Sequence, residues 1–466
     1  MSESVSAYIG SLVQKARAAQ QQIEFATQEE VDDICARMAR AGTTEAFARQ
    51  IAELAVEESG MGRVDSKYAK MMAKVKGTWR DMKGKATVGI VERDDSRGIV
   101  KFAKPVGVIG ALIPVTNCEA TPVCKVLSAI KTRNAIILAP HPRAAKTGKL
   151  ASDRMRAVLA RHGFPEDLVQ IVDEISVEAS QELMAQCDLV LATGGPGMVK
   201  AAYSSGTPAF GVGAGNAVTI VDTGVDLDDV ADKIMRSKTF DWATSCSTEN
   251  SCLAQESIYD EFKAALERAG AYVVPASEKQ TIQDALWPDG EHLNRKIVAQ
   301  PANKIAEIAG INLPEGRTFF VVEEDRIATD NPFTGEKLSV VMSLLKYREF
   351  DDAIEMVNRI TGIAGSGHSC GIHTADDEKV TRLATAVRVS RVMVNQPQCL
   401  ANSGAWTNGM PMTLTLGCGT WGRNISSDNI TYEKLMNTTW VAWPIPSTQP
   451  SDMELFGADV VSEEWD

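Results

Sequence analysis

Apolar side chains recur at helical spacing through residues 1–80, which are otherwise rich in Ala, Glu, Gln, Lys and Arg. Two apolar stripes are Ile9, Leu12, Val13 and Ala16, and then Val31, Ile34, Cys35 and Met38. Stripes of this period predict amphipathic helices, each with one buried face. Thr27 precedes Glu29 and Glu30, an arrangement typical of a helix N-cap.

The pattern changes at residue 87. Residues 87–92 and 99–102 alternate apolar and polar positions, and the polar turn between them predicts a β-hairpin. Short apolar runs then alternate with helical stretches. The predicted strands are 106–114, 134–139, 169–172, 189–192 and 218–222, and two of the helices between them are 122–131 and 145–161. This alternation predicts a parallel, doubly wound sheet.

A second α/β unit is predicted further along the chain. Residues 225–238 read as a helix that leads into a cysteine-containing stretch, and helices and strands alternate again over 258–425. The C-terminal residues include Trp440 and Trp443 and predict an arm whose aromatic side chains need a surface to cover.

Composition narrows the class of protein. A chain of 466 residues exceeds what one core usually supports, so two or three domains are expected. A net charge of −13 argues against general nucleic-acid binding and against an acidic membrane surface. No apolar run is long enough to span a bilayer, and no secretory signal is visible. Nine scattered cysteines without a CxxC pair favour a reducing cytoplasm, and no metal-ligand cluster is evident.

The strongest chemical candidate is Cys246, which lies among small polar residues at positions 244–248. A thiol attacks a carbonyl only as its thiolate, so it needs access and local polarity. A cysteine in a buried turn explains the same stretch equally well. Cys252 is followed by Leu253 and Ala254 and is predicted to be a strand residue facing a core.

Three loops follow predicted strands, where ligands of parallel sheets bind. Asn117 follows the first strand; it is either an oxyanion donor or a turn former. Residues 140–147 begin a helix with basic neighbours, which suits either a phosphate or plain solvent. Residues 193–197 form a glycine turn that lacks the full dinucleotide fingerprint. The glycine-rich runs 210–216 and 416–424 suggest close backbone approaches. For His368 and His373 a structural role is favoured over a catalytic one.

Taken together and in order, these motifs resemble the aldehyde dehydrogenase superfamily, and more narrowly its CoA-acylating branch. The resemblance covers about residues 5–445. It is most specific at 131–137, 140–143, 201–209, 237–246 and 415–422. It implies an α/β fold of two doubly wound domains with a cleft between them, completed by a small β oligomerisation hairpin and a C-terminal arm.

The resemblance also implies residue roles. Cys246 matches the nucleophile that forms a thiohemiacetal and then a thioester, and Asn117 matches the oxyanion donor. The implied cofactor-binding residues are His141, Pro142 and Arg143 on the adenosine side, Thr193, Gly194 and Gly195 near the pyrophosphate, and Gly215, Glu336 and Leu338. Glu336 matches the residue that holds the nicotinamide ribose. Leu338 stands where many relatives carry Phe.

One departure concerns the reaction. Hydrolytic members carry a water-activating Glu where this chain has Val212. A valine cannot abstract a proton, so the thioester should persist until a thiol arrives, and a thiol loses its proton more readily than water. Acyl-CoA is therefore the expected product. The alternatives are a hydrolytic enzyme that releases a free acid and a catalytically silent scaffold subunit. Sulfoacetaldehyde is the favoured substrate, ahead of succinate semialdehyde, and acetaldehyde remains open.

NADP is expected to be used and favoured over NAD. Relatives that prefer NAD often place a carboxylate at the position of Ala144, where it repels a 2′-phosphate. Arg143 is the expected phosphate partner, because a guanidinium binds phosphate oxygens in pairs, and Lys146 adds positive charge.

The implied domains are a dinucleotide-binding domain at 1–86 and 104–235, a catalytic domain at 236–425, and an oligomerisation hairpin and arm at 87–103 and 426–466. The hairpin and the arm are expected to pair between subunits, in a homodimer or homotetramer.

Overall fold

The computed structural model describes residues 3–464, and residues 1–2 and 465–466 of the predicted domains lie outside this range. Four helices open the chain: α1 (Glu3–Ile23), α2 (Gln28–Gly42), α3 (Glu45–Ser59) and α4 (Val64–Met82). The two predicted stripes face the core of this region. Thr27 caps α2 in a reciprocal arrangement, since its Oγ1 accepts from Glu30 N at 3.2 Å and its own N–H donates to Glu30 Oε2 at 2.7 Å. Within the described residues, no helix is long and apolar enough to cross a membrane.

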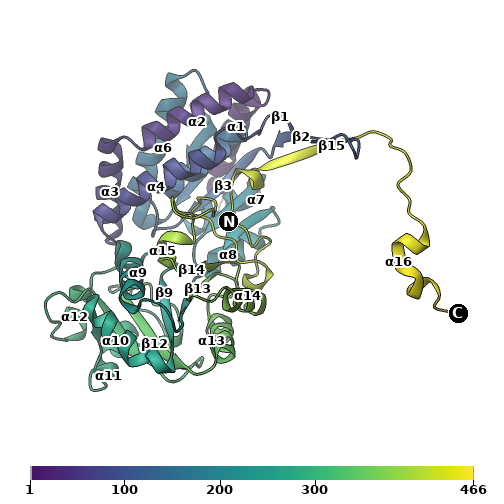
Figure 1. The fold of residues 1–466 in the computed structure, drawn as a ribbon. Coiled ribbons are helices and arrows are strands. Elements are labelled where there is room, and N and C mark those ends of the chain that lie inside the picture. The colour runs from purple at the N-terminus through teal and green to yellow at the C-terminus, as the bar shows by residue number, and fades with distance from the viewer. Residues whose placement is uncertain (1–2, 465–466) are drawn as a thin grey trace.

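A five-stranded parallel sheet forms the core of the first domain, in the order β5-β4-β3-β6-β7. Its strands are β3 (Val108–Ile113), β4 (Ala135–Pro140), β5 (Val169–Ile171), β6 (Leu189–Thr193) and β7 (Ala209–Val212). The helices between them are α5 (Thr121–Lys131), α6 (Ala145–Arg161), α7 (Val177–Gln186) and α8 (Pro196–Tyr203). Helices α1 and α7 pack together, and α2 covers α5 and α6 (Figure 1). The predicted doubly wound fold is confirmed.

A second parallel sheet has seven strands, in the order β10-β11-β12-β9-β8-β13-β14. These are β8 (Ala217–Val221), β9 (Glu249–Gln255), β10 (Ala271–Val273), β11 (Phe319–Glu323), β12 (Val341–Tyr347), β13 (Cys370–His373) and β14 (Val392–Val394). The helices of this domain are α9 (Leu227–Thr239), α10 (Tyr259–Arg268), α11 (Lys279–Leu286), α12 (Ala302–Ala309), α13 (Phe350–Ile363), α14 (Asp377–Ala386) and α15 (Gln398–Ala401). As predicted, Cys252 is a buried residue of β9.

This topology corrects the predicted end of the first domain at residue 235. Strand β8 was grouped with the preceding strands, but it pairs with β9 on one side and β13 on the other. All five of its residues are buried. A fully buried strand shows the same apolar run in either sheet, so the hydrophobic pattern does not identify its neighbours. The chain passes between the two sheets at residues 213–216.

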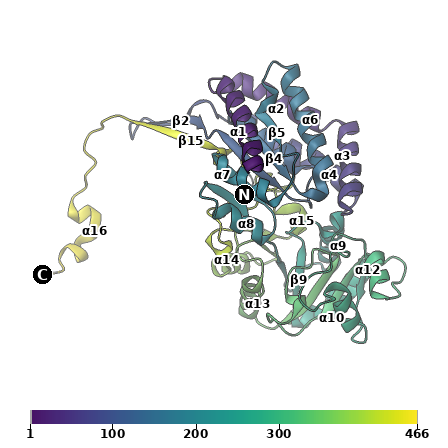
Figure 2. The ribbon, with the colours of Figure 1, turned by 180° about the vertical axis from the view of Figure 1, so that it is seen from behind.

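The hairpin of β1 (Gly89–Asp94) and β2 (Ile99–Pro105) is extended by a third strand, β15 (Met436–Ala442). The sequence predicts that arm and hairpin pair between subunits, whereas here β15 pairs antiparallel with β2 of its own chain. Helix α16 (Asp452–Val461) lies at the end of an extended tail that leaves the body of the molecule (Figures 1 and 2). Trp440 and Trp443 remain more than half exposed.

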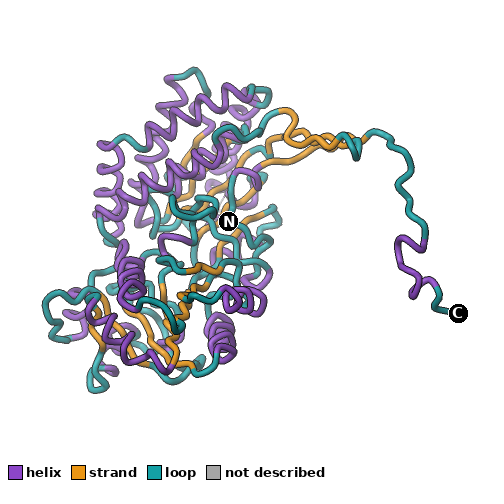
Figure 3. The backbone as a smooth tube through the Cα atoms, viewed as in Figure 1, coloured by secondary structure: helices purple, strands orange, loops and turns teal. Residues whose placement is uncertain are grey.

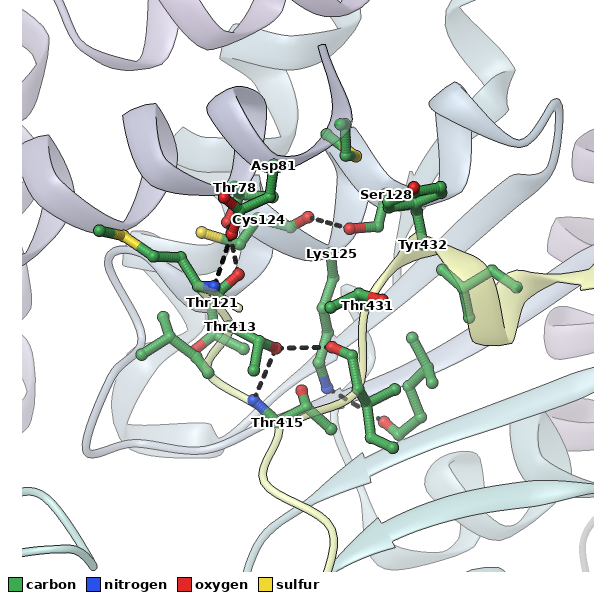
Figure 4. A pocket seen from close by; sticks show the side chains of 16 residues that line it. Thr78, Asp81, Thr121, Cys124, Lys125, Ser128, Thr413, Thr415, Thr431 and Tyr432 are labelled. Carbon is green, nitrogen blue, oxygen red and sulfur yellow. Dashed lines mark hydrogen bonds between the residues drawn. The ribbon is translucent and has the colours of Figure 1, made fainter. Parts of the chain in front are cut away.

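The segment between the second sheet and β15 is mostly loop (Figure 3). It returns to the first domain. Met412 N donates to Asp81 Oδ2 of α4 at 2.7 Å, and Thr413 Oγ1 donates to Ile430 O at 2.7 Å (Figure 4). The small cavity that these residues enclose with α4 and α5 measures about 30 Å³. It has room for about one water molecule, so it is a packing defect rather than a ligand site.

Candidate active site

A cavity of about 660 Å³ lies where the loops of the two sheets meet, within the size range of small-molecule sites. It gathers most of the residues that the sequence singles out. Those that line it are Asn117, His141, Thr193, Gly194, Gly195, Gly215, Cys246, Glu336 and Leu338. Pro142 and Arg143 lie on the turn beyond His141 and do not line it.

The thiol of Cys246 is presented by an unusual backbone. Helix α9 ends in a tight turn at Phe240–Ala243, where Asp241, Trp242 and Ala243 all have left-handed φ angles of 50°, 50° and 62°. Such conformations are costly for residues other than glycine and persist only where the surroundings enforce them. Gly215, from the loop before β8, lies so close that a Cβ there would collide with the backbone of Cys246. Only glycine allows this approach between the two loops.

His368 is the nearest titratable partner of the thiol. Its Nε2 lies 3.1 Å from Cys246 Sγ, and its Nδ1 lies 2.8 Å from Ser369 Oγ. Burial, reinforced by Glu336, raises the pKa of Cys246 to about 12. Burial, reinforced by Arg391, lowers the pKa of His368 to about 3. The resting pair is therefore a thiol beside a neutral imidazole that is able to accept its proton.

The sequence predicts a structural role for both His368 and His373, and this prediction misses the contact of His368 with the thiol. His373 is a buried residue of β13, as a structural role requires, whereas His368 lies in the loop before that strand. Gly365 and Gly367 hold that loop at φ angles of 82° and 77°, and a Cβ on Gly367 would collide with Cys418 of the C-terminal glycine run. Two glycines just before a histidine that lies outside a strand were the available signal for a positioned side chain.

The side chain of Asn117 is held by its carbonyl end. Asn117 Oδ1 accepts a hydrogen bond from Lys70 Nζ at 2.7 Å. Among residues 3–464, Nδ2 makes only a 3.4 Å contact with Thr116 Oγ1. The amide therefore keeps an N–H group for a ligand in the cavity, as an oxyanion donor requires.

The cofactor-side residues fit a dinucleotide. Glu336 Oε1 is buried without a hydrogen-bond partner in the described chain, and burial raises the pKa of Glu336 to about 8. A buried acceptor of this kind suits the hydroxyl groups of a ribose. Thr193 Oγ1 accepts from the buried Lys125 at 3.1 Å, which fixes the end of β6. Gly195 caps helix α8 with open space where a side chain would stand.

The adenosine side differs from expectation at the start of α6, which was a possible phosphate site. The Glu58 carboxylate of α3 already accepts hydrogen bonds there, from Lys146 N, Thr147 N and Thr147 Oγ1, each at 2.8 Å. The helix start therefore carries its own anion. The guanidinium of Arg143 donates to Ser59 O, so it points toward α3 rather than lying free in solvent.

Val212 ends β7, is buried and lines the cavity. No carboxylate therefore stands at this position, where the hydrolytic relatives described above carry their water-activating Glu. Among the residues described, no group of three or more His, Cys, Asp or Glu side chains is arranged to hold a metal ion.

Comparison with known proteins places the fold and the site in context. The sequence profile of the Aldehyde dehydrogenase family matches residues 1–286. A sulfoacetaldehyde dehydrogenase of an Acholeplasma species is 46% identical over 96% of this chain and 93% of its own length. The acetylating succinate-semialdehyde dehydrogenase of Clostridium kluyveri is 40% identical over 98% of this chain and all of its own. An acetylating aldehyde dehydrogenase from Geobacillus thermoglucosidasius superposes with a TM-score of 0.92 at 36% identity, covering 96% of this chain and 99% of that one.

Proposed function

The chain belongs to the aldehyde dehydrogenase family, and from that premise we propose that it oxidises a short anionic aldehyde to the corresponding acyl-CoA. NAD(P) is the oxidant and CoA the acyl acceptor. The observation that carries the proposal is that Cys246, with His368 beside its sulfur, lines a cavity in which Val212 stands in place of a carboxylate.

In the first step, His368 Nε2 takes the proton of Cys246 as its sulfur attacks the aldehyde carbon. Both pKa shifts keep the proton on sulfur at rest, so it moves only as the C–S bond forms. The carbonyl oxygen becomes an oxyanion, which the Asn117 amide and the Cys246 backbone N–H stabilise.

A nicotinamide bound in the cavity would supply the hydride acceptor for the thiohemiacetal carbon. Glu336 would hold the ribose, and the turn at Thr193–Gly195, which precedes α8, would hold the pyrophosphate. Collapse of the oxyanion leaves a thioester on Cys246, and His368 releases its proton to solvent.

The second half-reaction transfers the acyl group. Neutral His368 takes the proton of the CoA thiol, whose sulfur attacks the thioester carbon and expels Cys246, which recovers the proton. The products are acyl-CoA, NAD(P)H and one proton. Water competes poorly because Val212 supplies no base to activate it.

Lys74 supports an anionic substrate, with sulfoacetaldehyde favoured. Its buried side chain lines the cavity, and Nζ donates to Ser403 O at 3.1 Å and Gly404 O at 2.6 Å. Within residues 3–464 it forms no ion pair with a carboxylate, and burial lowers its pKa to about 8. A buried ammonium with neutral partners gains from an incoming sulfonate or carboxylate.

A steady-state assay of sulfoacetaldehyde, succinate semialdehyde and acetaldehyde, with and without CoA, tests the proposal. Acyl-CoA should appear only with CoA, and rapid release of free acid without CoA would contradict an acylating reaction. Lys74→Met should raise KM for the anionic aldehydes by about 10–100-fold and leave acetaldehyde within a few-fold. Lys76→Met, on the exposed side of the same helix, is the matched control. Equal losses for charged and neutral aldehydes would remove Lys74 from substrate recognition.

Three finer points belong to the proposal. NADP is favoured, with Arg143 as the partner of its 2′-phosphate, although Glu58 opposes an added negative charge beside it. A cytoplasmic location agrees with the cysteines, all of which are free. A homodimer or homotetramer would cover the exposed Trp440 and Trp443 on the three-stranded ribbon.

A further inference from the structure

Four buried charged groups lie behind Asn117, between helix α4 and the turn that precedes Cys246. They are Lys67 and Lys70 on α4, Glu119 after β3, and Asp241 in the left-handed turn, all at most 5% exposed. Asp241 Oδ2 lies 3.2 Å from Lys67 Nζ and 2.7 Å from Lys70 Nζ. Glu119 lies 3.6 Å from Lys67 and 3.4 Å from Lys70. Two positive and two negative charges therefore balance across the boundary between the two domains.

The two lysines differ in what else they touch. Lys67 Nζ donates to the backbone carbonyl of Thr116 at 3.2 Å, whereas Lys70 Nζ donates to the side-chain oxygen of Asn117 at 2.7 Å. In the described chain Lys70 is thus the cation that reaches the oxyanion donor. Lys67 and Lys70 lie on the same helix, are both buried and contact the same two carboxylates. Lys67 is therefore a matched control for the contact between Lys70 and Asn117.

We propose that Lys70 is a positioning residue for the oxyanion site, an inference that rests on the function proposed above. An asparagine amide can be turned by half a revolution with little change in shape, which would direct its oxygen at the developing oxyanion. A lysine ammonium has no acceptor, so it pairs only with the amide oxygen. Lys70 therefore leaves the N–H₂ group of Asn117 facing the cavity.

Asp241 connects the Lys70–Asn117 contact to the loop that carries the nucleophile. Its Oδ1 accepts from Arg63 N at 2.8 Å, and its Oδ2 accepts from Thr244 Oγ1 at 2.7 Å, two residues before Cys246. Gly62 allows the approach, because a Cβ there would collide with the Asp241 carboxylate. One carboxylate thus contacts both Lys70 and the loop of the thiol, so it links the oxyanion donor to the loop of the attacking sulfur although they belong to different domains.

The test compares charge-balanced variants. Removing one lysine alone leaves an uncompensated buried carboxylate, so each is combined with Glu119→Gln, whose oxygens accept no hydrogen bond in residues 3–464. Lys70→Met/Glu119→Gln should slow single-turnover thioester formation by about 10–100-fold, part of the cost of losing an oxyanion donor. Its KM for the aldehyde should stay within a few-fold. Lys67→Met/Glu119→Gln should lose less than about threefold.

A double-mutant cycle with Asn117→Ala distinguishes a positioning role of Lys70 from a purely structural one. The effect of the Lys70 variant should vanish in the Asn117→Ala background, because there is no amide left to orient. Equal losses for the two lysine variants, a loss that persists without Asn117, or a rise in KM at constant kcat would each overturn the proposal. A wild-type enzyme that makes no acyl-CoA would instead refute the proposed function.

Lys70→Arg covers the case in which the methionine variants do not fold, since it keeps the buried charge. The guanidinium places its N–H donors differently from the lysine ammonium, so Lys70→Arg should slow thioester formation in the wild-type background. It should have no effect in the Asn117→Ala background. The same slowing in both backgrounds would overturn the proposal. Thermal unfolding of each variant, followed by circular dichroism, establishes which proteins are folded.

Discussion

The two ends of the cavity are built in opposite ways. At the thiol end, where Cys246 meets the buried His368, desolvation raises the pKa of the thiol to about 12 and lowers the pKa of the imidazole to about 3. At the adenosine end, the turn at His141–Arg143 is exposed, the Arg143 guanidinium donates to the backbone of α3, and the Glu58 carboxylate accepts hydrogen bonds from the start of α6.

This difference predicts how strongly substitutions at each end of the cavity should affect activity. Desolvated groups in contact act strongly on each other because little water screens them, and a single loss there should be severe. Exposed groups at the adenosine end interact through solvent, so changes there should alter cofactor preference by small factors.

The largest effect is expected from Cys246→Ala, which should abolish NAD(P)H formation with any aldehyde. Cys252→Ala, in a fully buried position of β9, should retain most of the activity per folded molecule. Stopped-flow measurement of NAD(P)H formation checks both. An active Cys246→Ala enzyme would refute the assignment of the nucleophile.

His368→Gln should lower the rate of thioester formation by about 10²–10⁴-fold, the usual contribution of a general base. Glutamine fills similar space but cannot take the proton of the thiol. His373→Gln is the matched control, because it removes the other buried histidine five residues further on, away from the thiol. Comparable losses in the two variants would point to a shared structural effect.

Titration of the thiol end should show no midpoint near neutral pH. The pKa of Cys246 is raised to about 12, so the thiolate fraction grows as pH rises and does not level off below that value. Alkylation of Cys246 by iodoacetamide should therefore accelerate about tenfold per pH unit between pH 7 and 9. His368, with its pKa lowered to about 3, stays neutral throughout this range. A plateau with a midpoint near pH 8 would contradict the raised pKa of Cys246.

Val212→Glu should begin to convert the reaction to hydrolysis, because it restores a carboxylate at the end of β7. Free acid should form several-fold faster than in the wild type when CoA is omitted. Val212→Gln controls for the cost of burying a polar side chain without providing a base. Mass spectrometry of the acyl-enzyme separates the two half-reactions, and equal free-acid rates in the Glu and Gln variants would count against the spatial match.

The smallest effects are expected at the adenosine end. Arg143→Ala should lower kcat/KM for NADP by up to about fivefold, the scale of an exposed ion pair, and leave NAD unchanged. Glu58→Gln should move the preference toward NADP, since it removes a negative charge beside Lys146 and Thr147. A kcat/KM for NAD several-fold above that for NADP in the wild type would refute the favoured cofactor.

Local features were readable from the sequence. The amphipathic helices, the hairpin and the parallel strands follow from hydrophobic period, and helix α6 begins and ends where predicted. The small polar neighbours of Cys246 and the place of Asn117 after a strand made both residues candidates, and the family resemblance suggested their roles. The same resemblance marked Val212 as standing at the position of the water-activating base.

The pairing of distant residues was decided only by the tertiary structure. His368 lies 122 positions from Cys246, Lys70 lies 47 from Asn117, and Glu58 lies 88 from the start of α6 that it caps. The same holds for β8, whose sheet was misassigned, and for β15, which pairs with the hairpin of its own chain. Hydrophobic period reports whether a side chain is buried but not what it is buried against. Hydrogen bonds and pKa shifts depend on that neighbour, so the protonation state of the thiol is set only by the tertiary structure around it.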